Sequence, residues 1–470
     1  MGWAFAGHTL LTGGAGGRSL VLALVADDLN AADWPVTAST ALLTDHYELT
    51  MLAGALHSGV ASRRAVFEVF ARHLPHGRRY GVVAGTGRLL DALAAFRFGP
   101  GELAFLRQTQ VVDDATARYL ESFAFAGDIW GYPEGECYFP GSPILVVEAP
   151  FAEAVVLETL VLSVLNHDCA IASAASRMVT AAGGRPLIEM GSRRTHEIAA
   201  VASARAAYIA GFATTSNLRA GRDYGVPTRG TSAHAFTLVH DSERQAFSTQ
   251  LAVQGKGTTL LVDTFDVAEA VRTAVEVAGP GLGAVRIDSG DLPVVARQVR
   301  ALLDSLGAQD TRIVLTGDLD EHSIAALATA PVDGYGVGTA LVTGSGAPTA
   351  ALVYKLVARA VTPGGGGHLL PVAKHSVGKP SRGGRKWAVR QLDGTGTAVA
   401  ERVSVVPPEP SADGRELLRP LVRRGEIVGT EPLAQARQRH RDALAELPAH
   451  ALQMSRGYPA IPTVMDPGGD

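Results

Sequence analysis

The residues best suited to chemistry lie in short polar clusters that follow short apolar runs. The cluster GVPTRGTSAHAF (225–236) sets His234 among glycine, threonine, serine and alanine. Such small neighbours cannot bury an imidazole against bulky side chains. Because a lone histidine is more often structural than catalytic, His234 becomes a candidate through the other clusters that accompany it.

The cluster RIDSGD (286–291) combines Arg286 with two carboxylates in one loop. Its carboxylates can hold Mg²⁺ through water or face a developing ribosyl cation, while Ser289 and Gly290 can approach a phosphate. The competing interpretation is an aspartate that caps the next helix beside an exposed salt bridge.

Three further clusters carry anion-binding chemistry. EMGSRR ends in two adjacent arginines, a pair that suits a carboxylate or a phosphate, and we favour Arg193 over Arg194. In TGDLDE (316–321), Asp318 either binds a ribose diol or caps the next helix. GVGTALVTGSG (336–346) has the composition of a backbone-amide nest for phosphate.

Lysine is rare in this chain, and four of the five lysines lie within 355–386. A lysine binds phosphate as a compact point charge, whereas arginine offers a planar fork. No Ser-His-Asp order, HExxH motif, paired-cysteine zinc site or Walker lysine is evident. Together the clusters predict a substrate with several phosphates, a ribose and a carboxylate.

Alternating apolar and amphipathic segments predict the elements that position these clusters. The expected strands are 186–190, 258–264, 284–288, 312–316 and 334–337. The expected helices are 195–210, 266–278 and 292–306, each closed by a glycine, and a later one over 433–447.

Strand, loop, helix and strand in series indicate parallel βα units. Because the polar clusters fall at the carboxyl ends of the strands, the pattern favours an α/β fold built as a (β/α) barrel. An open doubly wound sheet would also place polar residues there, but about seven units occur without a dominant dinucleotide fingerprint.

The chain divides into four expected parts. We predict a flexible leader over 1–40, an N-terminal α/β domain over 41–150, the barrel over 151–360 and a C-terminal segment over 361–470. The last segment is expected to pack back on the N-terminal domain and complete it.

Composition indicates a globular enzyme with small-molecule partners. The 470 residues carry a net charge of −4 with no massed basic residues, which argues against nucleic acid as a partner. No apolar run approaches the roughly 18 residues of a membrane span. Two cysteines outside any CxxC spacing fit a cytoplasmic protein. The run 19–26 could pass for a signal sequence, but a glycine-rich rather than basic stretch precedes it.

In their order and residue sequence, these motifs resemble those of the nicotinate phosphoribosyltransferase family. The resemblance runs from residue 42 to the end of the chain. The motifs that carry it are LLTDHYELTM (42–51), FEVFARHLP (67–75), EMGSRR (189–194), GFATTSNLRAG (211–221), GTSAHAF (230–236), LVDTFD (261–266), RIDSGDL (286–292), TGDLDE (316–321), GVGT (336–339), KLV (355–357) and PVAKHSVGK (371–379).

The resemblance implies a type II phosphoribosyltransferase: an N-terminal domain, an irregular barrel, a C-terminal segment and usually a homodimer. It also implies transfer of phosphoribose from 5-phosphoribosyl 1-pyrophosphate to nicotinate in NAD salvage, yielding nicotinate mononucleotide and pyrophosphate. ATP is the co-substrate, Mg²⁺ the cofactor, and the enzyme is classed as a ligase. By the same resemblance, His234 is the residue that becomes a phosphohistidine.

The resemblance assigns roles to further residues, and leaves the metal ligands open. His234, Asp288 and Arg286 are the expected catalytic residues. Substrate contacts are expected from Tyr47 (nicotinate, across a dimer interface), Arg193, Thr215, Ser289, Gly290, Asp318 (ribose or Mg²⁺), Gly338 and Thr339 (5-phosphate), and ATP or polyphosphate contacts from Lys374, Lys379 and Lys386.

Three alternatives remain at this point. A nicotinamide phosphoribosyltransferase would share the fold and the histidine, but TTSN (214–217) lacks the acidic residue expected beside a carboxamide. Quinolinate phosphoribosyltransferases are shorter and lack the GTSAH histidine. A non-catalytic nucleotide sensor on this scaffold would have no need for all the loops together.

Overall fold

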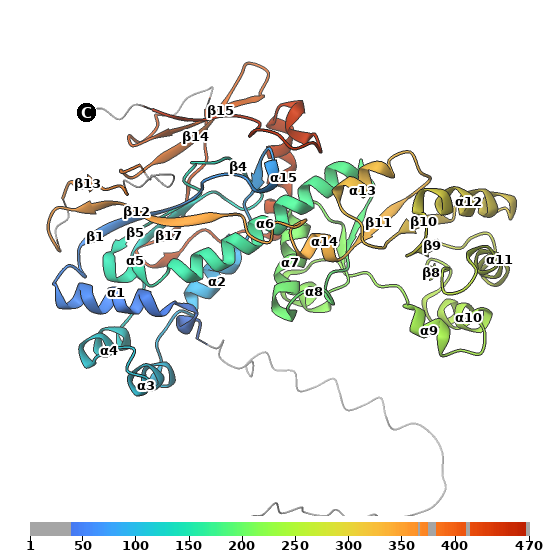
Figure 1. The fold of residues 1–470 in the computed structure, drawn as a ribbon, viewed down its shortest axis with the longest axis horizontal. Helices are drawn as coiled ribbons and strands as arrows, with labels where there is room; N and C mark the ends of the chain where they lie inside the picture. The colour runs from blue at the N-terminus through green and yellow to red at the C-terminus, as the bar shows by residue number, and fades with distance from the viewer. Residues whose placement is uncertain (1–38, 365–366, 375–381, 410–413, 467–470) are drawn as a thin grey trace, which may run out of the picture. The chain divides into compact units, whose positions relative to one another are not determined.

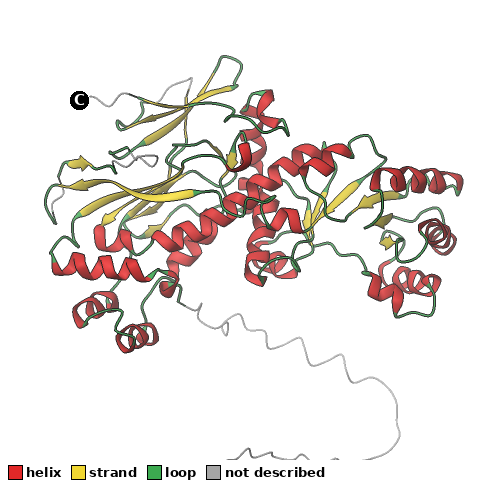
Figure 2. Ribbon diagram, in the orientation of Figure 1, coloured by secondary structure: helices red, strands yellow, loops and turns green. Residues whose placement is uncertain are grey.

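The computed structural model of the protein describes residues 39–364, 367–374, 382–409 and 414–466 (Figure 1). The leader predicted for 1–40 therefore falls outside the described residues, apart from its last two positions. Figure 2 shows helices around one set of strands and a second, separate group of strands. None of the described helices has both the length and the apolar character needed to cross a lipid bilayer.

Six parallel strands form one sheet in the order β7-β6-β11-β10-β9-β8. These strands are β6 (Leu187–Glu189), β7 (Thr214–Thr215), β8 (Thr259–Leu261), β9 (Ala284–Ile287), β10 (Arg312–Leu315) and β11 (Gly334–Val337). The five strands predicted from apolar runs are confirmed, and the predicted α/β class is correct. Within the described chain no pairing joins the edge strands β7 and β8, so the sheet is a half-barrel that stays open on one side.

The predicted helices are also confirmed. Between these strands lie α7 (Glu197–Ile209), α11 (Val267–Ala278) and α12 (Leu292–Ser305), and the later predicted helix is α15 (Leu433–Glu446). Asp266 and Asp291 cap the N-termini of α11 and α12. Each side chain accepts a hydrogen bond from the backbone N–H three positions later in the sequence. The remaining helices are α1 (His46–His57), α2 (Thr86–Ala94), α3 (Pro100–Gln108), α4 (Asp114–Glu121), α5 (Phe151–Val155), α6 (Glu158–Ala182), α8 (Leu218–Tyr224), α9 (His234–Leu238), α10 (Glu243–Gln254), α13 (Glu321–Ala326) and α14 (Thr339–Val342), with short 3₁₀ turns at Ala41–Leu43, Pro75–Gly77 and Ala449–Leu452.

An antiparallel sheet of seven strands has the order β13-β12-β1-β5-β3-β17-β18. Its strands are β1 (Arg64–Ala71), β3 (Asp128–Gly131), β5 (Leu145–Pro150), β12 (Leu352–Ala360), β13 (Leu369–Pro371), β17 (Arg419–Arg423) and β18 (Glu426–Ile427). Strand β17 pairs with β3, so the C-terminal segment completes the N-terminal sheet, as the fold prediction required. Strand β12, which the limit at 360 assigns to the barrel, pairs with β1 in this sheet.

Two smaller sheets complete the fold. One has the order β16-β14-β15-β19, and the other pairs β2 with β4. Their strands are β2 (Gly81–Val82), β4 (Cys137–Tyr138), β14 (Trp387–Leu392), β15 (Ala398–Ser404), β16 (Gly414–Glu416) and β19 (Thr463–Met465).

Helix α6 joins the two main cores. Its side chains from Leu160 to Ala170 pack in the core of the antiparallel sheet, and those from Ile171 to Ala182 pack in the core of the half-barrel. Alanine and serine dominate the buried second half of this helix, which allows neighbouring helices to approach it closely. The half-barrel is thus attached to the N-terminal sheet by one continuous rigid element.

Candidate active site at the carboxyl ends of the parallel strands

The predicted phosphate and ribose loops line one pocket of 190 Å³ at the carboxyl ends of β6, β9, β10 and β11. Six predicted site residues lie in this lining. The lining residues are Met190, Arg193, Arg194, Arg286, Asp288, Thr316, Gly317, Asp318, Gly336, Gly338 and Thr339. Two arginines on one wall and a glycine-threonine turn on another suit an anionic ligand.

Gly317 allows the loops after β9 and β10 to touch. It has a φ of 103°, and a Cβ atom on it would lie 2.3 Å from the carbonyl oxygen of Asp288. Any larger residue would push these loops apart, so this position requires glycine. Asp318, the next residue, also has a positive φ, 44°. The cap of α13 is Asp320, which accepts the N–H groups of His322 and Ser323, so Asp318 is left for the pocket.

The guanidinium of Arg286 connects three loops beneath the pocket. Its Nε donates to Thr316 Oγ1 at 2.9 Å, one Nη donates to Thr231 Oγ1 at 2.8 Å, and the other donates to Asp288 Oδ1 at 3.0 Å. A further contact to the Ser232 carbonyl at 3.4 Å leaves one of the five guanidinium N–H groups for a ligand. Arg286 therefore organises the floor of the site and keeps one donor for substrate.

Asp288 is held ionised at neutral pH. Burial alone would raise its pKa, but hydrogen bonds from the Thr316 hydroxyl and the Arg286 guanidinium outweigh burial and hold the pKa below its ordinary value. The alternative interpretation combined a capping aspartate with a salt bridge, and in the structure these two roles belong to different residues. Asp291 caps α12, and Asp288 pairs with Arg286.

His234 is the first residue of α9 and lies between two carboxylates. Its Nδ1 lies 3.2 Å from Thr264 Oγ1, and its Nε2 lies 4.0 Å from Asp263 Oδ1 and 4.0 Å from Asp288 Oδ2. The side chain is 41% exposed, so a ligand can reach the imidazole ring. This geometry joins the histidine cluster to the RIDSGD cluster.

Asp263 is the main site residue that the sequence interpretation did not assign. Its side chain is 2% exposed, and Oδ2 accepts the Asp288 N–H at 2.9 Å and the Ser289 hydroxyl at 2.6 Å. Its Oδ1 is buried without a hydrogen-bond partner among the described residues and faces His234. The available signal was its place in LVDTFD, two residues after the end of β8, because the other site loops also follow strand ends.

Four predicted site residues do not line the pocket. Thr215 is fully buried and donates its hydroxyl to Glu189, and neither Ser289 nor Gly290 belongs to the pocket lining. Tyr47 lies on α1 and is 44% exposed, and it does not line the pocket either.

The predicted lysines also differ in their surroundings. Lys386 is buried and donates to Glu68 Oε2 at 2.7 Å and to the Arg382 carbonyl at 2.9 Å, so its ammonium is already partnered. Lys374 is exposed, and Lys379 lies outside the described residues.

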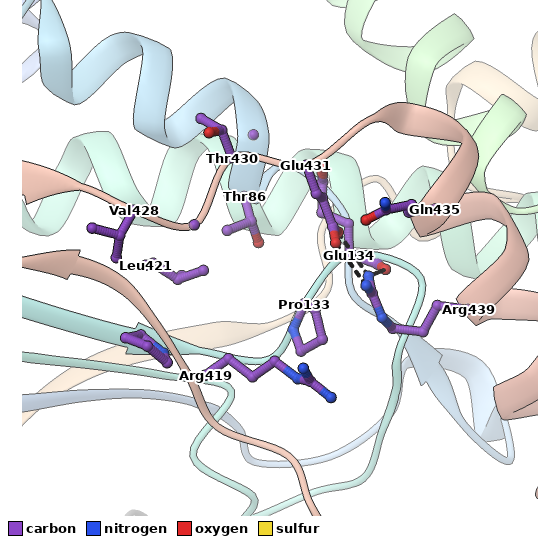
Figure 3. Close-up of a pocket in the computed structure, with 13 residues that line it drawn as sticks. Thr86, Pro133, Glu134, Arg419, Leu421, Val428, Thr430, Glu431, Gln435 and Arg439 are labelled. Carbon is purple, nitrogen blue, oxygen red and sulfur yellow. Dashed lines mark hydrogen bonds and ion pairs between the residues drawn. The ribbon is translucent and has the colours of Figure 1, made fainter.

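A larger cavity of 410 Å³ lies between β17, α15 and the start of α2 (Figure 3). None of the predicted site residues lines it. Its charged groups are mostly paired, since Glu134 binds Arg205 at 2.6 Å and Arg439 binds Glu431 at 2.6 Å. The smaller pocket, which brings the polar clusters together, is therefore the candidate active site.

Comparisons with known proteins identify the family of this chain. Residues 42–166 match the model of the nicotinate phosphoribosyltransferase (NAPRTase) N-terminal domain. Nicotinate phosphoribosyltransferase pncB1 of Mycobacterium tuberculosis is 60% identical over 432 residues, covering 90% of this chain and 94% of that protein. The Bacillus subtilis nicotinate phosphoribosyltransferase is 37% identical, covering 68% of this chain and 67% of that protein.

A comparison of folds gives a further similar protein. The crystal structure of human nicotinic acid phosphoribosyltransferase superposes with a TM-score of 0.75 at 24% identity, covering 90% of this chain and 97% of that chain. At this identity the superposition shows the fold alone, while the extended identity to the bacterial proteins shows the family. The chain belongs to the nicotinate phosphoribosyltransferase family.

Proposed function

We propose that the protein transfers phosphoribose from 5-phosphoribosyl 1-pyrophosphate to nicotinate, with ATP consumed through phosphorylation of His234. The observation that carries this proposal is the position of His234 Nε2, 4.0 Å from both Asp263 and Asp288, at the edge of an arginine-lined pocket. The close bacterial relatives bear the name of this activity.

Each wall of the pocket has its own role in the proposal. The turn at Gly338 and Thr339 binds the 5-phosphate, Arg193 binds a substrate anion, and Asp318 binds the ribose diol. Displacement at the anomeric carbon passes through a cationic, oxocarbenium-like state, and the ionised carboxylate of Asp288 stabilises that charge. The ring nitrogen of nicotinate already has a lone pair, so positioning replaces a general base.

The phosphorylation step uses the free side of the imidazole. In the tautomer whose Nδ1 carries the proton and faces Thr264 Oγ1, Nε2 holds the lone pair that attacks the γ-phosphorus, so that an N–P bond forms and the bond to the departing ADP oxygen breaks. Two carboxylates beside Nε2 repel the incoming phosphate. A cation is needed there, and Asp263 Oδ1, which has no hydrogen-bond partner among the described residues, is a suitable ligand.

Mg²⁺ is the cation that this chemistry requires. The described residues contain no group of three or more histidine, cysteine or acidic side chains placed to hold a metal by themselves. One or two carboxylates from Asp263 and Asp288 fit the usual binding of Mg²⁺, which takes its other ligands from water and substrate phosphates. When bound, the ion neutralises phosphate charge.

Acid specificity tests the proposed function. We expect kcat/KM for nicotinate to exceed that for nicotinamide by about 10- to 100-fold, because a carboxylate gains a charge-assisted hydrogen bond that the amide lacks. The measurement is formation of the two mononucleotides in parallel assays with ATP and 5-phosphoribosyl 1-pyrophosphate. Equal efficiency with both acceptors would contradict the proposal and favour the nicotinamide alternative.

We also propose a homodimer in which Tyr47 contacts the acceptor site of the partner. The support is a group of exposed apolar side chains around the start of α1, with Leu42 at 42%, Leu43 at 55% and Tyr47 at 44%. Such a group is typical of a protein interface.

Both cysteines, Cys137 and Cys169, are free and buried, which is compatible with a cytoplasmic location.

Hybrid dimers test the role of Tyr47. Tyr47→Ala and Asp288→Ala chains are each expected to be inactive, while their mixture recovers about a quarter of wild-type activity, because half of the randomly mixed dimers hold one intact site. The measurement is activity after subunit exchange, verified by mass-tagged chains. Exchange without recovery would mean that Tyr47 acts within its own chain or not at all.

A further inference from the structure

We propose that Glu189 is a positioning residue that fixes the loop of Arg193 and Arg194 and thereby sets the affinity for the pyrophosphate-bearing donor. This inference rests on the proposed function, because it assigns those arginines to a substrate anion. Its evidence is a hydrogen-bond network centred on Glu189 and Thr215, neither of which lines the pocket.

The network begins at the end of β6. Glu189 is the last residue of that strand and is 0% exposed. One carboxylate oxygen accepts the N–H of Gly191 and the other accepts the hydroxyl of Thr215, the last residue of the neighbouring strand β7. A single carboxylate thus connects the loops that leave two adjacent strands.

The same two loops are connected again farther out. Thr215 Oγ1 accepts the N–H of Asn217 at 2.9 Å, and the Asn217 side-chain amide donates to Ser192 Oγ at 3.0 Å. Ser192 lies directly before Arg193, and the Arg194 N–H closes the turn by donating to the Gly191 carbonyl at 2.8 Å. The arginines therefore leave a turn that is anchored at both ends of the network.

Glu189 accepts a hydrogen bond at each of its two carboxylate oxygens. A backbone N–H can only donate, so the oxygen that faces Gly191 is an acceptor, and the Thr215 hydroxyl donates to the other oxygen while it accepts from the Asn217 N–H. No cationic side chain pairs with Glu189 anywhere in the described chain. A buried carboxylate without a counter-cation is costly, which is consistent with a role beyond packing.

Close packing places the loop of Arg193 and Arg194 directly against the opposite wall of the pocket. A Cβ atom at Gly191 would lie 2.2 Å from Val342 Cγ1 on α14 and 3.2 Å from the Gly338 carbonyl oxygen. The arginine turn thus rests against the glycine-threonine turn proposed for the 5-phosphate. Loss of the Glu189 anchor would change the distance between two groups that bind the same donor.

Glu189→Gln is the variant that tests the inference. Glutamine has the same shape but no charge. Its carbonyl oxygen can still accept the Gly191 N–H, whereas its NH₂ group cannot accept the Thr215 proton, so the charged hydrogen bond to Gly191 becomes a neutral one and the hydrogen bond to Thr215 must reverse. We expect the KM for 5-phosphoribosyl 1-pyrophosphate to rise about tenfold, because both hydrogen bonds lose their charged acceptor, with the KM for nicotinate changed less than about twofold. Inorganic pyrophosphate, measured by calorimetry, should bind about tenfold more weakly.

A pH profile adds a readout that packing alone would not produce. Burial raises the pKa of Glu189, despite the hydrogen bonds from Thr215 and Gly191. Protonation as the pH falls should therefore raise the donor KM of the wild-type protein, relative to Glu189→Gln, whose amide does not titrate. Identical pH profiles of donor KM for the two proteins would overturn the inference.

Two further variants keep the test decisive. Glu401→Gln, a buried glutamate paired with Arg390 in the C-terminal sheet, should lower the melting temperature without changing donor KM. Thr215→Val keeps the Glu189 carboxylate but removes the hydroxyl that donates to it and accepts from the Asn217 N–H, and it should raise the donor KM about threefold even if Glu189→Gln fails to fold. If Glu189→Gln lowers the melting temperature but leaves the donor KM and the pyrophosphate affinity unchanged, Glu189 is merely structural.

Absence of nicotinate turnover by the wild-type protein would instead refute the proposed function, and the pyrophosphate titration would still test Glu189.

Discussion

Asp288→Asn is expected to lower kcat/KM by about 10²- to 10³-fold, one of the two largest effects we predict. The substitution removes the negative charge that stabilises the cationic transition state, and electrostatic groups of this kind contribute effects of that size. It also weakens the anchor of Arg286, because Asp288 Oδ1 accepts from that guanidinium at 3.0 Å.

Steady-state kinetics with nicotinate and 5-phosphoribosyl 1-pyrophosphate measure this effect. Asp304→Asn is the matched control, since Asp304 is half exposed on α12 and pairs with Arg300 away from the pocket. It should retain kcat/KM within about twofold, as surface changes usually do. An Asp288→Asn enzyme as active as this control would exclude Asp288 from the reaction.

His234→Ala is expected to abolish both the acid-labile phosphoenzyme and the stimulation by ATP, while a slow ATP-independent reaction remains. The residual reaction follows from the intact pocket, because His234 is not among its lining residues. Coupling between ATP consumption and substrate affinity of ordinary size, about 1–3 kcal/mol, predicts a loss of roughly 5- to 150-fold in the presence of ATP.

Labelling with γ-³²P ATP and rates measured with and without ATP test this prediction. His240→Gln is the control, because His240 lies in the same segment but contacts the Phe236 carbonyl at 2.7 Å rather than a carboxylate. It should keep both the label and the stimulation. Retention of either property by His234→Ala would assign the phosphoryl group to another residue.

The sequence predicted the strand ends of the site well, because strong apolar periodicity defines β6, β9, β10 and β11 and their loops must meet at one edge of a parallel sheet. It did not predict the orientation of Thr215. Strand β7 has only two residues, too few to show which face of the sheet each side chain occupies.

Long-range pairing explains the other differences. Lys386 was predicted to bind polyphosphate, but the structure pairs it with Glu68, which lies 318 positions earlier in the chain. No local pattern announces such a partner. Asp263 was overlooked for a related reason, since only the folded sheet shows that LVDTFD ends beside both His234 and RIDSGD.

The unpaired edges of the half-barrel have a mechanical consequence. The segment that carries His234, including α8, α9 and α10, connects the two edge strands β7 and β8, which share no backbone ladder in the described chain. A small rotation at these edges would change the width of the site without breaking any strand pairing. A closed barrel would resist that motion with a continuous ring of hydrogen bonds. In the proposed reaction, such a change of width would let one site accept ATP in one step and 5-phosphoribosyl 1-pyrophosphate in the next.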